Sequence, residues 1–357
     1  MRVSDGAPPA SSSASPPGVA SEPARLPRAV EGEALRRDVT LEHGGRLAEL
    51  RVGYRLYGDP SRPLVVVLGG ISAGRHVTAG ADDPRPGWWD AMVGEGRPID
   101  TTAHAVLGLD WVGGSGATTG PAADAADAAG AAFPVVDTHD QATAVVMALD
   151  ALGVTRAHSV VGASYGAMVA LALCARHAAR VGHAVVIAGA HESQPMATAL
   201  RSLQRRIVRL GLAAGRPRDA LVIARGLGMT TYRTAEEFAA RFDQVPEWTA
   251  EGARFPVEQY LVHVGERYAA WATPESFLRL SESLDLHRVD PGIVTTPTTI
   301  IAVDSDTLVP LWQMRELRDA LAGPAALHVL SSIYGHDAFL KEIERMGALI
   351  RAALAAA

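Results

Sequence analysis

A serine flanked by glycines is the first residue of this sequence whose type and setting suggest a nucleophile. Gly162, Ser164 and Gly166 belong to a GxSxG pentapeptide that separates the run HSVV from the small-residue run AMVALALCA. A serine on a tight turn from a strand into a helix exposes its hydroxyl, and such a turn requires very small neighbours. The motif therefore predicts a nucleophilic serine at position 164.

An acid and a histidine follow this serine in the chain. The run TTIIAV at 298–303 predicts a buried strand that leads into Asp304 and Asp306, and His336 follows the strand-like run LHVL at 327–330. Parallel sheets place their sites at the carboxyl ends of the strands. A neutral imidazole can take a proton from a serine and return it to a leaving group. We expect His336 to be this base, oriented by Asp304 or Asp306.

Two backbone amides are candidates for stabilising the oxyanion of an acyl-transfer reaction. One should come from the residue after the nucleophile and the other from the loop after the third strand. These are the amides of Tyr165 and Ile71, and Ile71 lies in the glycine-rich segment LGGISAG.

The composition favours a globular enzyme. The chain has 357 residues, 48% of them hydrophobic, and a net charge of −6, which disfavours nucleic acid as a partner. No apolar stretch approaches the roughly 18 residues of a membrane helix, and no apolar segment follows the first arginine, so we expect no membrane association and a cytoplasmic protein. Cys174 is the only cysteine, and its setting predicts a small buried residue. We expect neither a metal nor a permanently bound cofactor.

Strand-like and helix-like runs alternate along much of the chain. After LVVVL at 64–68, most strand-like runs are separated by helix-like segments such as 141–152. This alternation predicts an α/β fold with a mostly parallel sheet. The further strand-like runs are 105–109, 159–161, 184–187, 298–303 and 327–330.

The remaining segments define the expected domains. Residues 1–34 are rich in Ala, Ser and Pro and are expected to form a disordered tail, with regular structure starting near Arg37 and a hairpin turn at Gly44-Gly45. The Ala-rich segment 121–134 is expected to be a loop. Residues 191–292 carry helical runs and predict a helical lid, inserted between the two parts of one core domain, 35–190 and 293–357.

Several spaced motifs together resemble the homoserine O-acyltransferases of the α/β-hydrolase fold. They are GWWD at 87–90, IDT at 99–101, GGSGATTGP at 113–121, FP at 133–134, the serine motif, and GHDAF at 335–339. The resemblance covers about residues 37–350. It implies an α/β-hydrolase fold and a homodimer that moves an acyl group from acyl-coenzyme A to homoserine through an acyl-serine, in methionine biosynthesis.

The resemblance also assigns roles to individual residues. Asp306 lies four residues before Pro310, as the acid does in hydrolase-fold chains, and is therefore preferred over Asp304. Arg225, seven residues before Tyr232 in a TYR motif, matches the arginine that binds the homoserine carboxylate, and Asp337 matches the residue that binds its ammonium group. Tyr232 is implied in substrate binding as well.

Departures from the acetyl-transferring pattern point to the succinyl-transferring branch. The pentapeptide reads GASYG where many relatives have methionine after the serine, and Arg201 stands where acetyl-transferring members tend to have asparagine. Arg201 and Arg205 are candidates for pairing with a succinyl carboxylate. By spacing alone, the same segment is an amphipathic helix with an apolar row of Leu203, Ile207 and Leu210 and with its arginines in solvent.

Other activities stay open from the sequence. An acetyl donor is possible, as is serine as acceptor, because one methylene discriminates by only ~1 to 3 kcal/mol. An esterase or thioesterase would use the same three residues with water as the acceptor. It would have no need of Arg225 and Asp337 as a clamp for the carboxylate and ammonium groups of an amino acid.

Overall fold

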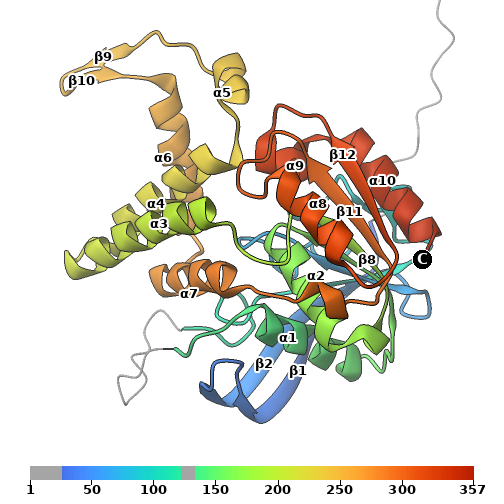
Figure 1. Ribbon diagram of the computed structural model, residues 1–357. Coiled ribbons are helices and arrows are strands. Elements are labelled where there is room, and N and C mark those ends of the chain that lie inside the picture. Colours follow the sequence, from blue (N-terminus) through green and yellow to red (C-terminus); the bar gives the residue numbers. More distant parts are fainter. Residues whose placement is uncertain (1–25, 122–132) are drawn as a thin grey trace, which may run out of the picture.

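The computed structural model describes residues 26–121 and 133–357, and all structural statements below concern these residues. Their centre is an eight-stranded sheet in the order β1-β2-β6-β3-β7-β8-β11-β12 (Figure 1). The strands from β6 to β12 are parallel, whereas β1 and β2 pair antiparallel at one edge. The mostly parallel α/β sheet predicted from the sequence is thus confirmed. The sheet strands are β1 Ala29–Thr40, β2 Arg46–Tyr57, β3 Leu64–Leu68, β6 Ala105–Leu109, β7 Ala157–Ala163, β8 Val181–Ile187, β11 Thr298–Val303 and β12 Ala325–Leu330, and β4 Val93–Gly94 pairs with β5 Ile99–Asp100 outside it.

The first hairpin corrects the predicted end of the N-terminal tail. Strand β1 starts at Ala29, not near Arg37, and pairs with β2 along nearly its whole length. The prediction failed because β1 has few large apolar residues, so its order comes from backbone pairing with β2 and not from its own pattern. The predicted turn at Gly44-Gly45 joins the two strands, with Gly44 at a φ of 80°. The rest of the predicted tail, 1–25, lies outside the described residues, as does most of the predicted loop 121–134.

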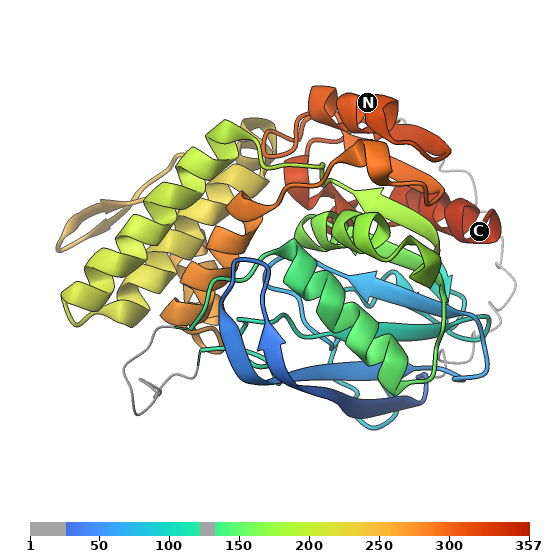
Figure 2. The ribbon, with the colours of Figure 1, turned by 60° about the horizontal axis from the view of Figure 1, so that its bottom comes forward.

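Alternate residues of the central strands build the two faces of the core. Leu64, Val66 and Leu68 of β3 face one side, while Val65 and Val67 face the other. Because successive side chains of a strand point to opposite faces, a continuous apolar strand must be covered on both. Helices α1 Thr138–Ala151, α2 Tyr165–Arg176 and α8 Leu311–Ala320 cover the first face, and α9 Ala338–Lys341 and α10 Ile343–Ala355 lie on the second (Figure 2).

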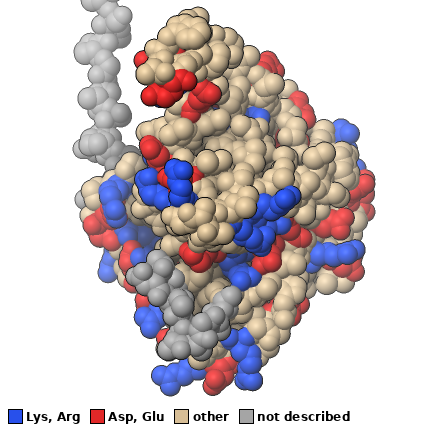
Figure 3. All heavy atoms as spheres, turned by 90° about the vertical axis from the view of Figure 1, so that its left-hand side faces the viewer, with Lys and Arg blue, Asp and Glu red and all other residues tan. Residues whose placement is uncertain are grey.

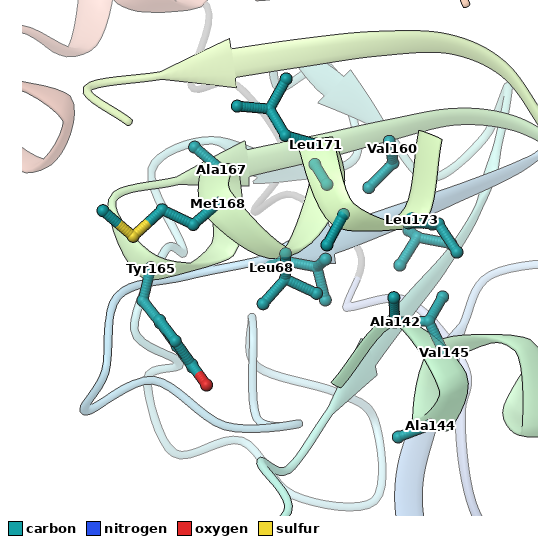
Figure 4. Close-up of a cluster of buried hydrophobic side chains, with 14 of the residues drawn as sticks. Leu68, Ala142, Ala144, Val145, Val160, Tyr165, Ala167, Met168, Leu171 and Leu173 are labelled. Carbon is teal, nitrogen blue, oxygen red and sulfur yellow. The ribbon is translucent and has the colours of Figure 1, made fainter. Parts of the chain in front are cut away.

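Helix α2 holds the serine motif in place through its burial. Its first ten residues, Tyr165 to Cys174, are all buried, and Leu171 and Leu173 pack with Val160 of β7 and Val145 of α1 (Figure 4). A helix enclosed in this way cannot move its N-terminal end without opening the core. Cys174 lies within it and is fully buried, as predicted, and burial raises the pKa of its thiol to about 12.

Five helices and a short hairpin lie between β8 and β11 in the chain and project from one end of the sheet (Figure 1). We call this segment, 195–286, the insertion. It has a small core of its own, which includes Val208, Leu221 and Phe277. None of the helices in the described ranges is long and apolar enough to span a membrane. The elements of the insertion are α3 Pro195–Ala213, α4 Pro217–Tyr232, α5 Ala235–Arg241, β9 Glu247–Thr249, β10 Gly252–Arg254, α6 Pro256–Ala269 and α7 Pro274–Leu286, and the short 3₁₀ turns elsewhere are Ala178–Arg180, Pro291–Ile293 and Gly335–Asp337.

The predicted apolar row of α3 is wrong. Leu203 and Leu210 are 47% and 69% exposed, and the buried positions are instead Ala197, Gln204, Val208 and Gly211. Small residues let α3 approach α4 closely, since a Cβ on Gly211 would lie 2.1 Å from the Cβ of Ala220. Of the predicted row, only Ile207 packs partly against the core of the insertion, while Leu203 and Leu210 point outwards. The contact face was missed because it combines Val208 with small and polar residues.

Candidate active site

Ser164 lies at the junction between β7 and α2, in a backbone conformation that few residues other than glycine adopt. Its φ is 56° and its ψ is −118°. Both neighbouring glycines are required by close backbone contacts. A Cβ on Gly162 would lie 2.3 Å from the Gly166 oxygen, and one on Gly166 would lie 2.2 Å from the Leu68 oxygen. The strained serine is thus clamped between the end of β3 and the start of α2.

His336 bridges Ser164 and an aspartate. Its Nε2 lies 2.7 Å from Ser164 Oγ, and its Nδ1 lies 2.7 Å from Asp306 Oδ2. The other oxygen of Asp306 accepts hydrogen bonds from the amides of Leu308 at 2.8 Å and Val309 at 3.0 Å, which fix the carboxylate. With Nδ1–H donated to Asp306, Nε2 is the free base that can accept the serine proton.

Asp304, the alternative to Asp306, lies elsewhere. Its Oδ1 accepts a hydrogen bond from the Ser332 amide at 3.2 Å, on an exposed loop. The structure therefore brings Asp306, and not Asp304, to the histidine.

The environment of His336 raises the pKa of its imidazole. Burial by itself favours the neutral ring and lowers the pKa, but the charge of Asp306 and its hydrogen bond favour the protonated ring and outweigh burial. The base is therefore strengthened by the carboxylate that orients it.

A cavity of about 610 Å³ connects these residues with the insertion. Ser164 and His336 lie at its sheet side, and α3, α4 and α6 contribute residues from the insertion. Ile71 lines the same cavity. Tyr165 is the first residue of α2, so its amide has no acceptor within the helix and is available to an oxyanion. The two predicted oxyanion amides thus belong to the segments that border Ser164.

Arg225 of α4 lines the cavity without a carboxylate partner among the described residues. Its guanidinium lies 4.9 Å from the centre of the Tyr268 ring and 5.4 Å from that of Tyr232. Its Nε is buried and has no hydrogen-bond partner in the structure. A half-buried cation that is held by aromatic rings and has no described carboxylate partner is a ready binding group for a carboxylate.

Asp337 and Tyr232, the other predicted substrate-binding residues, line the cavity too. The Tyr232 ring centre is 6.0 Å from that of His336. Asp337 Oδ2 accepts a hydrogen bond from Arg233 Nε at 2.7 Å, and Arg233 in turn contacts Glu237 at 2.8 Å. Arg233 belongs to the TYR motif, but no role was predicted for it from the sequence. In the structure it fixes Asp337 and leaves the other carboxylate oxygen available to a ligand.

Arg201 and Arg205 differ in the structure. Arg201 lines the cavity, while Arg205 is not among the lining residues. Both pair with Asp285 of α7, at 2.6 Å and 2.5 Å. Arg205 NH1 also donates to the Ser281 carbonyl at 3.0 Å. The expectation that these arginines lie in solvent is wrong, because their side chains are only 13% and 12% exposed. Asp285, which the sequence analysis missed, has two cations around it, so the group keeps a net positive charge.

Helix α6 contributes a cavity face that the sequence analysis also missed. Tyr260, Val264 and Tyr268 follow a helical spacing and line the cavity, as does Trp271 in the turn after the helix. The periodicity was readable in the sequence, but aromatic residues at this spacing are ordinarily core residues.

The chain matches known proteins over most of its length. A family model described as the alpha/beta hydrolase fold matches residues 63–343. A homoserine O-succinyltransferase from Xanthomonas campestris pv. campestris is 44% identical over 92% of this chain and 85% of its own. An L-serine/homoserine O-acetyltransferase from Streptomyces lavendulae is 35% identical over 89% of this chain and 93% of its own.

A solved structure shares the fold. The crystal structure of esterase E22 superimposes with a TM-score of 0.82, at 18% identity, over 91% of this chain and 100% of its own. Because an esterase has so similar a fold, the fold alone does not separate transfer of an acyl group to an amino acid from transfer to water.

Proposed function

We propose that this chain, which belongs to the homoserine O-acyltransferase family of the α/β-hydrolase fold, transfers the succinyl group of succinyl-coenzyme A to the hydroxyl of L-homoserine. The observation that carries the proposal is the hydrogen-bonded triad of Asp306, His336 and Ser164. Ser164 and His336 line the same cavity as Arg225, which has no described carboxylate partner. The first group of residues can form an acyl-serine, and the arginine can hold an amino acid beside it. The product ester would serve methionine biosynthesis.

The first half-reaction acylates Ser164. His336 Nε2 takes the hydroxyl proton as Oγ attacks the thioester carbonyl, and the amides of Tyr165 and Ile71 stabilise the oxyanion. When the tetrahedral intermediate collapses, the C–S bond breaks. The imidazolium gives its proton to the sulfur, so that coenzyme A leaves as a thiol and the succinyl group remains as an ester of Ser164.

The second half-reaction transfers the acyl group. The homoserine hydroxyl gives its proton to His336 and attacks the acyl-serine carbonyl, and the proton returns to Ser164 Oγ as the product ester forms. No permanently bound cofactor takes part in this scheme. Transfer exceeds hydrolysis because a bound acceptor reaches an effective molarity that can exceed ~10⁵ M.

Three residues give this acceptor its orientation. Arg225 would bind the homoserine carboxylate through paired N–H groups, and Asp337 would bind the ammonium group. Tyr232 lies between Arg225 and His336, with ring contacts to both. The clamp would hold the backbone of the amino acid and leave its side-chain hydroxyl facing His336.

Arg201 supports succinyl as the acyl group. Its side chain lines the same cavity as Ser164 and His336. A succinyl carboxylate would therefore meet a cation in the cavity that contains the reacting serine. Arg205 is not among the residues that line the cavity, and we propose that it holds Asp285 in position. Acetyl-coenzyme A as donor and serine as acceptor are the alternatives, in line with the name of the Streptomyces relative, an L-serine/homoserine O-acetyltransferase.

We further propose that the enzyme is a cytoplasmic homodimer. Met196, Leu203 and Leu210 are exposed at seven-residue spacing along α3, which places them on one face of the helix. The end of the molecule that carries the insertion is mostly uncharged, with acidic and basic side chains interspersed (Figure 3). An exposed apolar row on such a surface suits a self-complementary interface. Light scattering on the purified protein would test it against a monomer.

The activity is tested by release of free coenzyme A thiol from succinyl-coenzyme A and from acetyl-coenzyme A, each with homoserine, serine or water. We expect release that depends on homoserine and prefers the succinyl donor. Preference for acetyl-coenzyme A would overturn the donor assignment. Equal release without any amino acid would identify a thioesterase and overturn the clamp.

A further inference from the structure

The cavity that contains Ser164 opens to solvent among three cationic side chains. Arg241, Arg267 and Lys341 all line it, and all three are exposed. They come from the end of α5, from α6 and from the end of α9. Within residues 26–121 and 133–357, no carboxylate lies within salt-bridge distance of Arg267 or Lys341. Arg241 is 3.7 Å from Glu237, which is already paired with Arg233 at 2.8 Å.

The charges that line the whole cavity are strongly biased. Six Lys and Arg side chains border it, against two carboxylates, an excess of four positive charges in a protein whose net charge is −6. Both carboxylates, Glu192 and Asp337, are themselves paired with arginines. A concave site lined by one sign of charge attracts ligands of the other sign. This cavity therefore suits a polyanionic ligand.

The side chains at the opening are arranged on rigid elements. The guanidinium of Arg241 lies 4.2 Å from the centre of the Tyr260 ring on α6. Arg267 follows Tyr260 by seven residues and thus lies on the same face of that helix. Tyr260 positions the first cation and α6 carries the second, and both side chains line the cavity.

A second, smaller cavity of about 350 Å³ adjoins the first and offers a rival route to the serine. The two share Ile71, Trp88 and Trp271. The charged residues of the second cavity are Glu31, Arg75, Asp83, Arg85 and Asp110, which neutralise one another in ion pairs and leave an excess of one negative charge, with His76 neutral. Its charge does not favour an anion.

We propose that Arg241, Arg267 and Lys341 form the subsite for the phosphate groups of the coenzyme A donor. The inference rests on the proposed function, which makes a coenzyme A thioester the acyl donor. That donor carries its diphosphate and 3′-phosphate at the opposite end from the thioester, so a cationic opening and a buried serine match its two ends. Exposed cations bind phosphates by charge and by hydrogen bonds from their N–H groups.

The test compares two donors on the same variants. Succinyl-coenzyme A carries the phosphates, whereas the succinyl thioester of N-acetylcysteamine lacks the whole nucleotide. We expect R241Q, R267Q and K341Q each to raise KM for succinyl-coenzyme A about threefold, and the triple variant about 30-fold, at the strength of exposed ion pairs. KM for the truncated donor and kcat should not change. Thermal unfolding midpoints equal to wild type would show that the variants are folded.

Two control variants decide between the routes. Arg85 lines the second cavity and is 82% exposed, so R85Q tests the rival opening. Arg62 lies outside both cavities and R62Q serves as a neutral surface control. Neither should alter KM for succinyl-coenzyme A. A rise in R85Q with none in the triple variant would overturn the proposal and assign the donor to the second cavity.

The salt dependence of the wild-type protein provides an independent measurement. Raising NaCl from 50 to 300 mM should raise KM for succinyl-coenzyme A and leave that for the truncated donor unchanged, because only the former relies on charge pairing. Equal effects on both donors would contradict the proposal. Failure of the proposed function is a different outcome, since it would leave the wild-type protein without homoserine-dependent turnover of either donor.

Discussion

Arg225 lies over the ring of Tyr268, with 4.9 Å between the guanidinium carbon and the ring centre, and no described carboxylate neutralises it. The aromatic ring is held by the core of the insertion, where Tyr268 is buried with Leu221 and Phe277. The cation is thus fixed in position before any ligand arrives. A preformed, unpaired cation is a costly feature for the free protein and a favourable one for an anionic substrate.

Replacing Arg225 with Gln should raise KM for homoserine by about 30-fold or more. Loss of a charged partner in a buried pair costs about 2 to 5 kcal/mol. R225K keeps the charge but not the planar fork, so it should recover only part of the loss. Steady-state kinetics with homoserine varied at saturating donor would measure both. If R225Q bound homoserine as wild type does, the clamp would be misassigned.

Ser164→Ala should abolish the acyl-enzyme. Incubation of wild-type protein with succinyl-coenzyme A, without acceptor, should add one succinyl group by intact mass, and the variant should add none. Its kcat should fall by about 10⁴-fold or more. Ser72→Ala is the matched control, because Ser72 lines the same cavity and has no part in the proposed chemistry. A persistent adduct in S164A would place the nucleophile elsewhere.

The raised pKa of His336 predicts the acid limb of the pH profile. The reaction requires neutral imidazole, so kcat/KM for the donor should fall as the pH drops through a pKa above 6.5. Asp306→Asn removes the charge that raises this pKa but keeps the burial that lowers it, so the acid limb should move to lower pH and kcat should fall. An unmoved limb in D306N would mean that another group controls the profile.

The same shift has a consequence for stability. A folded-state pKa above the unfolded one means that protonated His336 stabilises the fold most fully below the unfolded pKa of about 6.5. This contribution is lost as the pH rises through the folded-state pKa.

Arg201→Leu should change the donor preference. Removal of this cation from the cavity that contains Ser164 should lower kcat/KM for succinyl-coenzyme A by about 10 to 100-fold, while the value for acetyl-coenzyme A should hold or rise. R205Q is the control, because Arg205 pairs with the same Asp285 but does not line the cavity. If both variants shifted the preference equally, the effect would come from Asp285 and not from a contact with the acyl group.

Gly166→Ala should destabilise the fold by about 3 kcal/mol, since the added Cβ would lie 2.2 Å from the Leu68 oxygen and the packed α2 cannot retreat. Gly226→Ala provides the control within a helix, because its Cβ would have no neighbour closer than 3.5 Å. Removing a helical glycine should leave stability unchanged or raise it by up to about 1 kcal/mol. Urea unfolding followed by circular dichroism would compare the two, and equal stabilities would contradict the close contact.

Much of this molecule could be predicted from local sequence. The strands β6 and β11 were predicted at their observed bounds because short continuous apolar runs have few alternatives inside a parallel sheet. The positions of Ser164 and His336 followed from chain order and from strand ends, since parallel strands bring their carboxyl ends to one edge. The choice of Asp306 over Asp304 came from the resemblance to hydrolase-fold chains. These inferences depend on short-range patterns that the chain carries in itself.

The tertiary structure decided the features that depend on distant partners. The order of β1 comes from β2, and the packing face of α3 comes from small residues that fit against α4. Asp285 lies 84 residues after Arg201, and no local pattern predicts that it pairs with both Arg201 and Arg205 while Arg225 has no described carboxylate partner. Charge pairing acts through space, so the sequence alone supplied the reactive residues, and only the fold determined which cations remain available to a ligand.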